Sequence, residues 1–162
     1  MIKTISAELV SFFILAAAPL FGGESWHEKE FEVRQSPKVI SDWLKDHPKE
    51  VARSTGSELI SKEGNKVRVR QDTPKGMMEF TLQETVKDNG KVYDYKSKLI
   101  QVHEGLIEDQ ETTVKLSPSR RGGTIVTIRL SASVRETKPI AIKTGLNKSA
   151  RGFQEMVESK FD

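Results

Sequence analysis

The residues that most often carry catalysis or metal binding are few in this sequence, and they are scattered. The three histidines, His27, His47 and His103, lie in separate segments, and neither an HxxxH nor an HExxH spacing occurs. Zinc sites on helices depend on such spacings, so the sequence predicts no metal site. The absence of cysteine excludes disulfides, thiol catalysis and cysteine-ligated metals. His103 and Glu104 are adjacent at the end of an expected strand, where they could form an acid–base pair or simply be solvated.

Two tyrosines are the best candidates for contacting a ligand. Tyr93 and Tyr95 are two positions apart in an alternating segment, so they are expected to share a strand face with Leu99. They could orient the polar end of a ligand, or they could be ordinary sheet aromatics. No nucleophile elbow, phosphate loop or dinucleotide fingerprint occurs, so no catalytic residue and no cofactor is predicted.

The distribution of charge argues against nucleic-acid binding. The 162 residues include 26 Lys and Arg against 23 Asp and Glu, which gives a net charge of +3. Basic and acidic residues are interspersed, so we expect no basic stripe that could follow a phosphate backbone. With 36% hydrophobic and 30% charged residues, the chain has the length and composition of one globular domain.

The N-terminal segment differs from the rest of the chain. After Lys3, the stretch LVSFFILAAAPLF contains only one polar residue, Ser11, and it is followed by Gly22-Gly23. A basic start, a short apolar run and small residues predict a secretory signal peptide over residues 1–23, with cleavage between 18 and 23. As a helix the run spans about 20 Å against about 30 Å of hydrocarbon, so no stable transmembrane anchor is expected. A buried N-terminal helix is the alternative; with a signal peptide, residues 24–162 are an exported domain, either periplasmic or secreted.

The beginning of the mature chain predicts one strand and two short helices. Residues 27–34 alternate in polarity as a half-buried strand does. Ser36-Pro37 then supplies a cap residue and a proline at the first helical position. His47-Pro48 ends this helix, and residues 49–54 form a second one.

A run of antiparallel strands follows, because alternating segments are separated by turn residues such as Asp88-Asn89-Gly90. The expected strands lie at residues 57–61, 67–70, 78–83, 93–99, 112–116 and 122–134. In the last of them Val126, Ile128 and Leu130 share one face, which is expected to be buried.

The C-terminal segment changes period and predicts one long amphipathic helix. Its apolar residues recur at spacings of three and four after Pro139. They are Ile142, Leu146, Ala150, Phe153, Val157 and Phe161. Gly145, Ser149 and Gly152 form a flank of small residues on this helix. Glycine inside a helix costs about 1 kcal/mol relative to alanine, so this flank serves either close packing of the helix on the sheet or space for a ligand.

This order of elements resembles the START-like (SRPBCC) superfamily, which includes polyketide cyclase/dehydratase and lipid-transport proteins. Three segments carry the resemblance: FEVRQSPKVISDWLKD, RRGGTIVTIRLSASV and TGLNKSARGFQEMVESKF. It covers about residues 26–162. It implies an α+β helix-grip fold, in which a curved antiparallel sheet of six to seven strands wraps around the long C-terminal helix, with two short helices after the first strand.

The resemblance also implies an apolar cavity between the sheet and the long helix. The residues expected to line it are Met78, Phe80, Leu82, Tyr93, Tyr95, Leu99, Val126, Ile128, Leu130, Ile142, Gly145, Leu146, Ser149 and Phe153. The leading hypothesis is an exported carrier or sensor for a lipid or another hydrophobic small molecule.

Two alternatives to the carrier stay open. A cyclase, dehydratase or hydrolase would need Tyr93, Tyr95, Gln101 and His103 to converge in the cavity. A protein-interaction module would have its pocket filled by its own side chains. The sequence indicates no oligomeric state.

Overall fold

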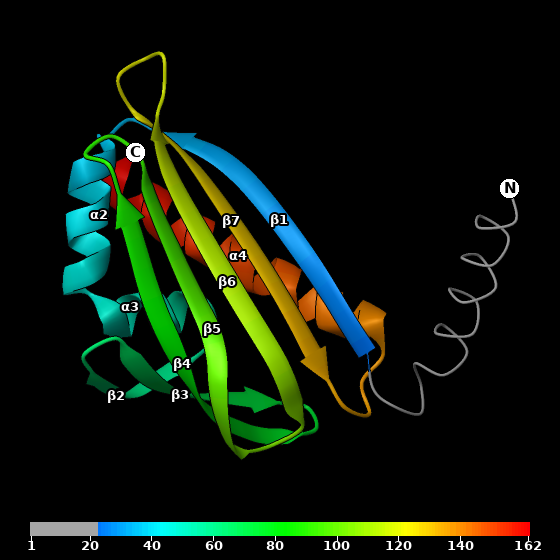
Figure 1. Ribbon diagram of the computed structural model, residues 1–162. Coiled ribbons are helices and arrows are strands. Elements are labelled where there is room, and N and C mark those ends of the chain that lie inside the picture. The colour runs from blue at the N-terminus through cyan, green and yellow to red at the C-terminus, as the bar shows by residue number, and fades with distance from the viewer. Residues whose placement is uncertain (1–22) are drawn as a thin grey trace, which may run out of the picture.

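The computed structural model describes residues 23–162, which fold as one antiparallel sheet with three helices (Figure 1). The predicted signal peptide lies outside the described residues, except for Gly23, which begins the first strand. The elements in chain order are β1 (Gly23–Val33), α2 (Pro37–Asp46), α3 (Pro48–Ser54), β2 (Glu58–Glu63), β3 (Lys66–Thr73), β4 (Gly76–Asp88), β5 (Tyr93–Glu104), β6 (Ile107–Pro118), β7 (Thr124–Val134) and α4 (Pro139–Phe161).

The seven strands form one sheet in the order β1-β7-β6-β5-β4-β3-β2, and every neighbouring pair is antiparallel. From β2 to β7 the chain is a meander, whereas β1 crosses over to pair with β7. Figure 1 shows the sheet curving around α4, which runs diagonally across one face. We call this face of the sheet its inner face. The predicted α+β helix-grip arrangement is thereby confirmed.

Irregular pairing accompanies the curvature of the sheet. The register between β4 and β5 shifts at Glu79/Phe80 and again at Thr81/Leu82, and the register between β2 and β3 shifts at Leu59/Ser61. An extra residue in one strand bends it and increases its twist. The shifts therefore lie where β2, β3 and the start of β4 turn away from the direction of β6 and β7.

The strands are longer than the alternation of the sequence predicts. β1 begins at Gly23 and not at residue 27, and β6 begins at Ile107 and not at residue 112. The added residues are mostly polar, and they are held by pairing with β7 on both of its sides. Ladder hydrogen bonds join backbones whatever the side chain, so polarity alone does not mark these strand ends.

The main hydrophobic cluster lies between α4 and the inner face of β1, β5, β6 and β7. It consists of Phe31, Val33, Ile40, Tyr93, Val114, Leu116, Val126, Ile128, Leu130, Ile142, Leu146, Ala150, Phe153 and Val157. The helix residues predicted from the spacing of three and four are buried here, while the last of them, Phe161, is half-buried. Each large apolar side chain buried in this way contributes about 1.5–3 kcal/mol.

A second, smaller cluster lies at the other end of the inner face. It is formed by Val67, Val69, Met78, Phe80 and Ile107. β3, β4 and the start of β6 contribute these residues, and α4 does not reach them. The space between the two clusters holds the candidate site.

Candidate ligand-binding cavity

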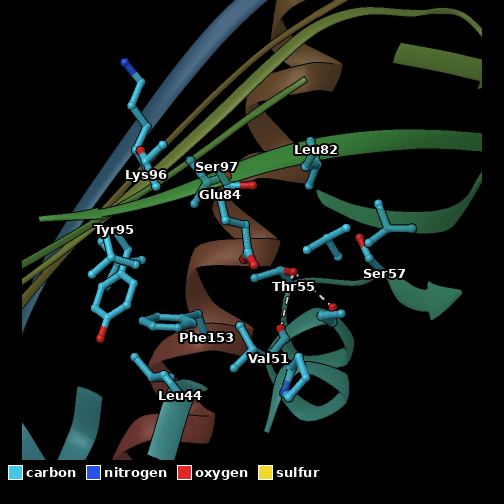
Figure 2. Close-up of a pocket in the computed structure, with 18 of the residues that line it drawn as sticks. Leu44, Val51, Thr55, Ser57, Leu82, Glu84, Tyr95, Lys96, Ser97 and Phe153 are labelled. Atoms are coloured by element: carbon cyan, nitrogen blue, oxygen red, sulfur yellow. Dashed lines mark hydrogen bonds between the residues drawn. The ribbon is translucent and has the colours of Figure 1, made fainter. Parts of the chain in front are cut away.

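A cavity of about 210 Å³ lies between the inner face of the sheet and the three helices. Its walls come from strands β2 to β7 on one side and from α2, α3 and α4 on the other. Figure 2 shows Leu44, Val51 and Phe153 gathered from the helices opposite Tyr95. The cavity therefore occupies the place that the sequence analysis assigned to it, between the sheet and the long helix.

The sheet wall is built from rows of directly paired residues, which share a face of the sheet. One row is apolar and runs across four strands: Val86, Tyr95, Val114 and Ile128. The next row is polar, with Glu84 on β4, Ser97 on β5 and Thr112 on β6. We call these three residues the polar row.

A third row, beyond the polar row, is apolar again. It contains Val67 on β3 and Leu82 on β4, which line the cavity, and Leu99 on β5, which packs against the smaller cluster. The polar row thus crosses the sheet wall between two apolar rows.

Helix α3 is held against α4 by a contact that only glycine permits. A Cβ atom at Gly152 would collide with the carbonyl oxygen of Ser54, at the C-terminal end of α3. Beside this contact, the Ser149 hydroxyl donates a hydrogen bond of 2.8 Å to the carbonyl oxygen of Thr55. The two helices therefore meet backbone to backbone, and this contact places Val51 and Thr55 in the cavity wall.

The flank of small residues on α4 serves a purpose other than the two that were expected. Gly152 and Ser149 pack against α3, and not against the sheet or a ligand. Gly145 is exposed, and apart from the adjoining residues and backbone of α4 itself, no atom of residues 23–162 lies within 4 Å of the Cβ that an alanine would place there. The expectation that Gly145 lines the cavity is wrong, because its side of the helix faces solvent.

An ion pair lies at the edge of the cavity. The Lys62 ammonium on β2 is 3.2 Å from Glu84 Oε1 on β4, and the two side chains are 37% and 42% exposed. Figure 2 shows the Glu84 side chain extending from β4 toward Thr55. Val86, which is 46% exposed, also lines the cavity. The cavity thus opens between β4 and the α2–α3 junction, where Lys45 and Pro48 complete its lining.

The hydroxyl of Tyr95 is already engaged within the protein. It forms a hydrogen bond with the hydroxyl of Ser41, which is fully buried on α2. Burial raises the pKa of the Tyr95 phenol, and the hydrogen bond from Ser41 opposes this shift. Tyr95 therefore presents its ring to the cavity, while its hydroxyl ties α2 to the sheet.

The predicted lining residues divide into three groups. Leu82, Tyr95, Ile128 and Phe153 line the cavity. The others on the sheet and on the buried face of α4 belong to the two clusters or pack against them: Met78, Phe80, Tyr93, Leu99, Val126, Leu130, Ile142 and Leu146. Gly145 and Ser149 lie on the flank described above. Strand alternation identifies the inner face, but it does not tell where along a strand the cavity lies.

Sequence reasoning missed much of the lining. The helix residues Leu44 and Val51 and the whole polar row were not predicted to line the cavity. Ser97 carried a usable signal, because it alternates with Tyr95 and Leu99 and so shares their face. Glu84 alternates with Leu82 and Val86, and Thr112 alternates with Val114 and Leu116, so both carried the same signal. Their polarity hid it, because a polar residue on a strand normally indicates the solvent face.

The arrangement that the enzyme alternative requires is not formed. Tyr93 and Tyr95 lie on the inner face, but Gln101 and His103 are exposed. The His103 Nε2 atom is 2.8 Å from the Thr81 hydroxyl, also outside the cavity. Within residues 23–162, no three His, Asp or Glu side chains lie close enough together to hold a metal ion, and no helix is long and apolar enough to cross a membrane.

The likeness of this chain to known proteins lies in its fold. No family model matches it, and no curated protein does. Many solved structures match. A START superfamily protein from Mycobacterium smegmatis is 13% identical, with a TM-score of 0.65 over 86% of this chain and 97% of that one.

Two further solved structures have relevant descriptions. A STAR-related lipid transfer protein from Xanthomonas axonopodis is 14% identical, with a TM-score of 0.60 over 83% of this chain and 84% of that one. The Zhui aromatase/cyclase from a Streptomyces species is 10% identical, with a TM-score of 0.60 over 85% and 93%. These identities are too low to transfer an activity. The sheet order, the long helix and these likenesses together show that the chain has the START-like helix-grip fold.

Proposed function

We propose that this protein binds a small hydrophobic molecule in the cavity between its sheet and its helices. The observation that carries the proposal is the cavity itself: about 210 Å³, walled by Leu44, Val51, Phe153 and two apolar rows of the sheet. Enclosed sites with mostly apolar walls and a few polar groups are typical of ligand-binding sites. The open volume between the sheet and the helices favours ligand binding over the interaction-module alternative, which requires a pocket filled by the protein's own side chains.

The volume of the cavity limits the ligand. A protein cavity of about 150 Å³ accepts benzene, and drug-sized ligands occupy about 300–1,000 Å³. A cavity of about 210 Å³ is suited to one or two rings or to a short single chain. A phospholipid with two acyl chains is several times too large to be enclosed.

We also propose that the protein works outside the cytoplasm. The support is the N-terminal sequence, in which Lys3 and a thirteen-residue apolar run resemble a secretory signal peptide. Gly23 pairs with Val134 in the β1–β7 ladder, so cleavage before Gly23 would leave β1 complete. N-terminal sequencing of protein recovered from the periplasm or the medium tests this, and an intact Met1 on cytoplasmic protein contradicts it.

Titration with a neutral fluorescent probe of two rings tests the binding function directly. We expect saturable binding by the natural protein and its loss in Ser97→Leu, whose larger side chain would fill the cavity. Lys98→Leu is the matched control, since residue 98 lies on the opposite face of β5 and is exposed. Equal binding by all three proteins, or no binding by any of them, contradicts the proposed function.

A further inference from the structure

We infer that the cavity prefers small apolar molecules that carry a hydrogen-bond donor, either a hydroxyl or an amine, and that the polar row recognises this donor. The inference rests on the proposed function, because it concerns which ligand the same cavity accepts. It begins from the unexpected place of Glu84, Ser97 and Thr112, which cross the sheet wall between two apolar rows.

The register makes these three residues one continuous surface. Ser97 pairs directly with Glu84 on one side and with Thr112 on the other. Directly paired side chains on one sheet face have Cβ atoms about 4.5–5.5 Å apart. All three residues line the cavity, so a ligand of one or two rings lying against the sheet spans this row.

The hydrogen-bonding capacity of the row is not used up within the protein. None of the side-chain hydrogen bonds formed among residues 23–162 involves the hydroxyl of Ser97 or that of Thr112. Glu84 pairs with Lys62 through Oε1, and a carboxylate has further lone pairs that can accept from a ligand. An apolar ligand that displaced water from these groups would leave them without partners, which weakens its binding.

The chemistry of the row selects the complementary group. A carboxylate only accepts hydrogen bonds, whereas a serine or threonine hydroxyl both donates and accepts. A ligand hydroxyl or amine can donate to Glu84 and also bond with Ser97 or Thr112. Lys45, Lys62 and Lys96 also line the cavity, and Lys62 and Lys96 pair with Glu84 and Glu111, so the row selects by hydrogen bonding and not by net charge.

Four naphthalene derivatives of nearly equal size test the preference by calorimetry or by NMR titration. 2-Naphthol carries a hydroxyl donor, 2-naphthylmethylamine an ammonium donor, 2-methoxynaphthalene only an acceptor, and 2-methylnaphthalene neither. We expect at least one donor probe to bind about tenfold more tightly than 2-methylnaphthalene, which corresponds to one or two net hydrogen bonds. 2-Methoxynaphthalene can accept from Ser97 or Thr112 but cannot donate to Glu84, so it should bind more weakly than the preferred donor probe. The two donor probes show whether a hydroxyl or an amine is preferred.

Thr112→Val removes one hydroxyl of the row and nearly preserves its shape. We expect this variant to reduce the donor preference to about twofold and to leave the affinity for 2-methylnaphthalene equal or higher. Thr113→Val is the matched control, because residue 113 lies on the opposite face of β6 and should keep the full preference. Ser97→Ala provides a second test in case Thr112→Val does not fold, and circular dichroism checks the fold of each variant.

The outcomes separate this inference from the proposed function. If the natural protein binds 2-methylnaphthalene as tightly as both donor probes, the cavity binds ligands but the role of the polar row is refuted. If Thr112→Val and Thr113→Val lose the preference to the same extent, that role is also refuted. If none of the four probes binds, the proposed function fails and the inference fails with it.

Discussion

The close approach of α3 to α4 leads to opposite predictions for the same substitution at two positions. Gly145 and Gly152 both lie inside α4, seven residues apart. Alanine is favoured over glycine in a helix by about 1 kcal/mol. At Gly145 no atom of residues 23–162 stands in the way of the added methyl group. Gly145→Ala should therefore raise the free energy of unfolding by about 1 kcal/mol.

Gly152→Ala gains the same helix propensity but meets the carbonyl oxygen of Ser54 closer than 3.0 Å, a distance that real Cβ atoms do not reach. This oxygen belongs to the backbone, so α3 or α4 must shift. Overpacking of this kind costs about 1–3 kcal/mol. The shift also strains the Ser149–Thr55 hydrogen bond, which is worth about 1 kcal/mol. After subtraction of the helix gain of about 1 kcal/mol, the net loss is about 1–3 kcal/mol.

Urea denaturation of the two variants beside the natural protein measures both changes, and thermal melting should follow with shifts of about 3–5 °C per kcal/mol. Because α3 carries Val51 and Ala52 into the cavity wall, Gly152→Ala should also weaken probe binding, while Gly145→Ala leaves it unchanged. If both variants gain stability equally, α3 does not lie where we describe it, and the account of this cavity wall is wrong.

Three further substitutions test other contacts. Tyr95→Phe should lower the free energy of unfolding by about 1–3 kcal/mol, because it leaves the buried Ser41 hydroxyl without its partner. In urea denaturation, the double variant with Ser41→Ala should recover part of this loss. A Tyr95→Phe variant as stable as the natural protein contradicts the contact. Phe153→Ala should lower the free energy of unfolding by about 3–5 kcal/mol, because Phe153 is 1% exposed. The variant should also have a larger cavity that binds a three-ring probe. A smaller loss of stability with unchanged probe selectivity contradicts the position of Phe153 in the cavity wall. Hydrogen bonds from Arg68, and more weakly from Arg70, hold the pKa of Glu79 below its ordinary value of 4.5. The Glu79 carboxylate therefore stabilises the fold above pH 4.5, and this contribution disappears as the pH falls through the lowered pKa. The stability difference between the natural protein and Glu79→Gln, measured by denaturation from pH 7 to pH 2, should therefore shrink only below about pH 4.5, and a difference independent of pH refutes this.

Much of the architecture was predictable because it depends on local patterns. The alternation in residues 122–134 and the spacing of three and four after Pro139 each identify one buried face. Val126, Ile128 and Leu130 are buried as expected, and so are Ile142 and Phe153. A periodic pattern is a property of neighbouring residues, so the face of the helix or strand that it marks as buried can be identified without knowing how the other elements pack.

The position of the cavity depended on contacts between distant segments. Glu84, Ser97 and Thr112 are separated by 13 and 15 residues, and only the register of β4, β5 and β6 puts them side by side. The polarity of Glu84 and Thr112 suggested solvent, although each alternates with apolar residues. Only the packing of the sheet against the helices shows that their face is an inner wall.

The sequence by itself determined the element order, the buried faces and the class of fold, because hydrophobic periodicity, caps and turn residues act within a few positions of the chain. Only the tertiary structure decided that Gly152 allows α3 to contact α4 whereas Gly145 faces solvent. It also decided that the hydroxyl of Tyr95 is hydrogen-bonded to Ser41. Two glycines on one helix are equivalent in sequence, and they differ only in what another part of the chain places opposite them. The volume of the cavity, about 210 Å³, arises in the same way, as the space that remains after all the elements have packed.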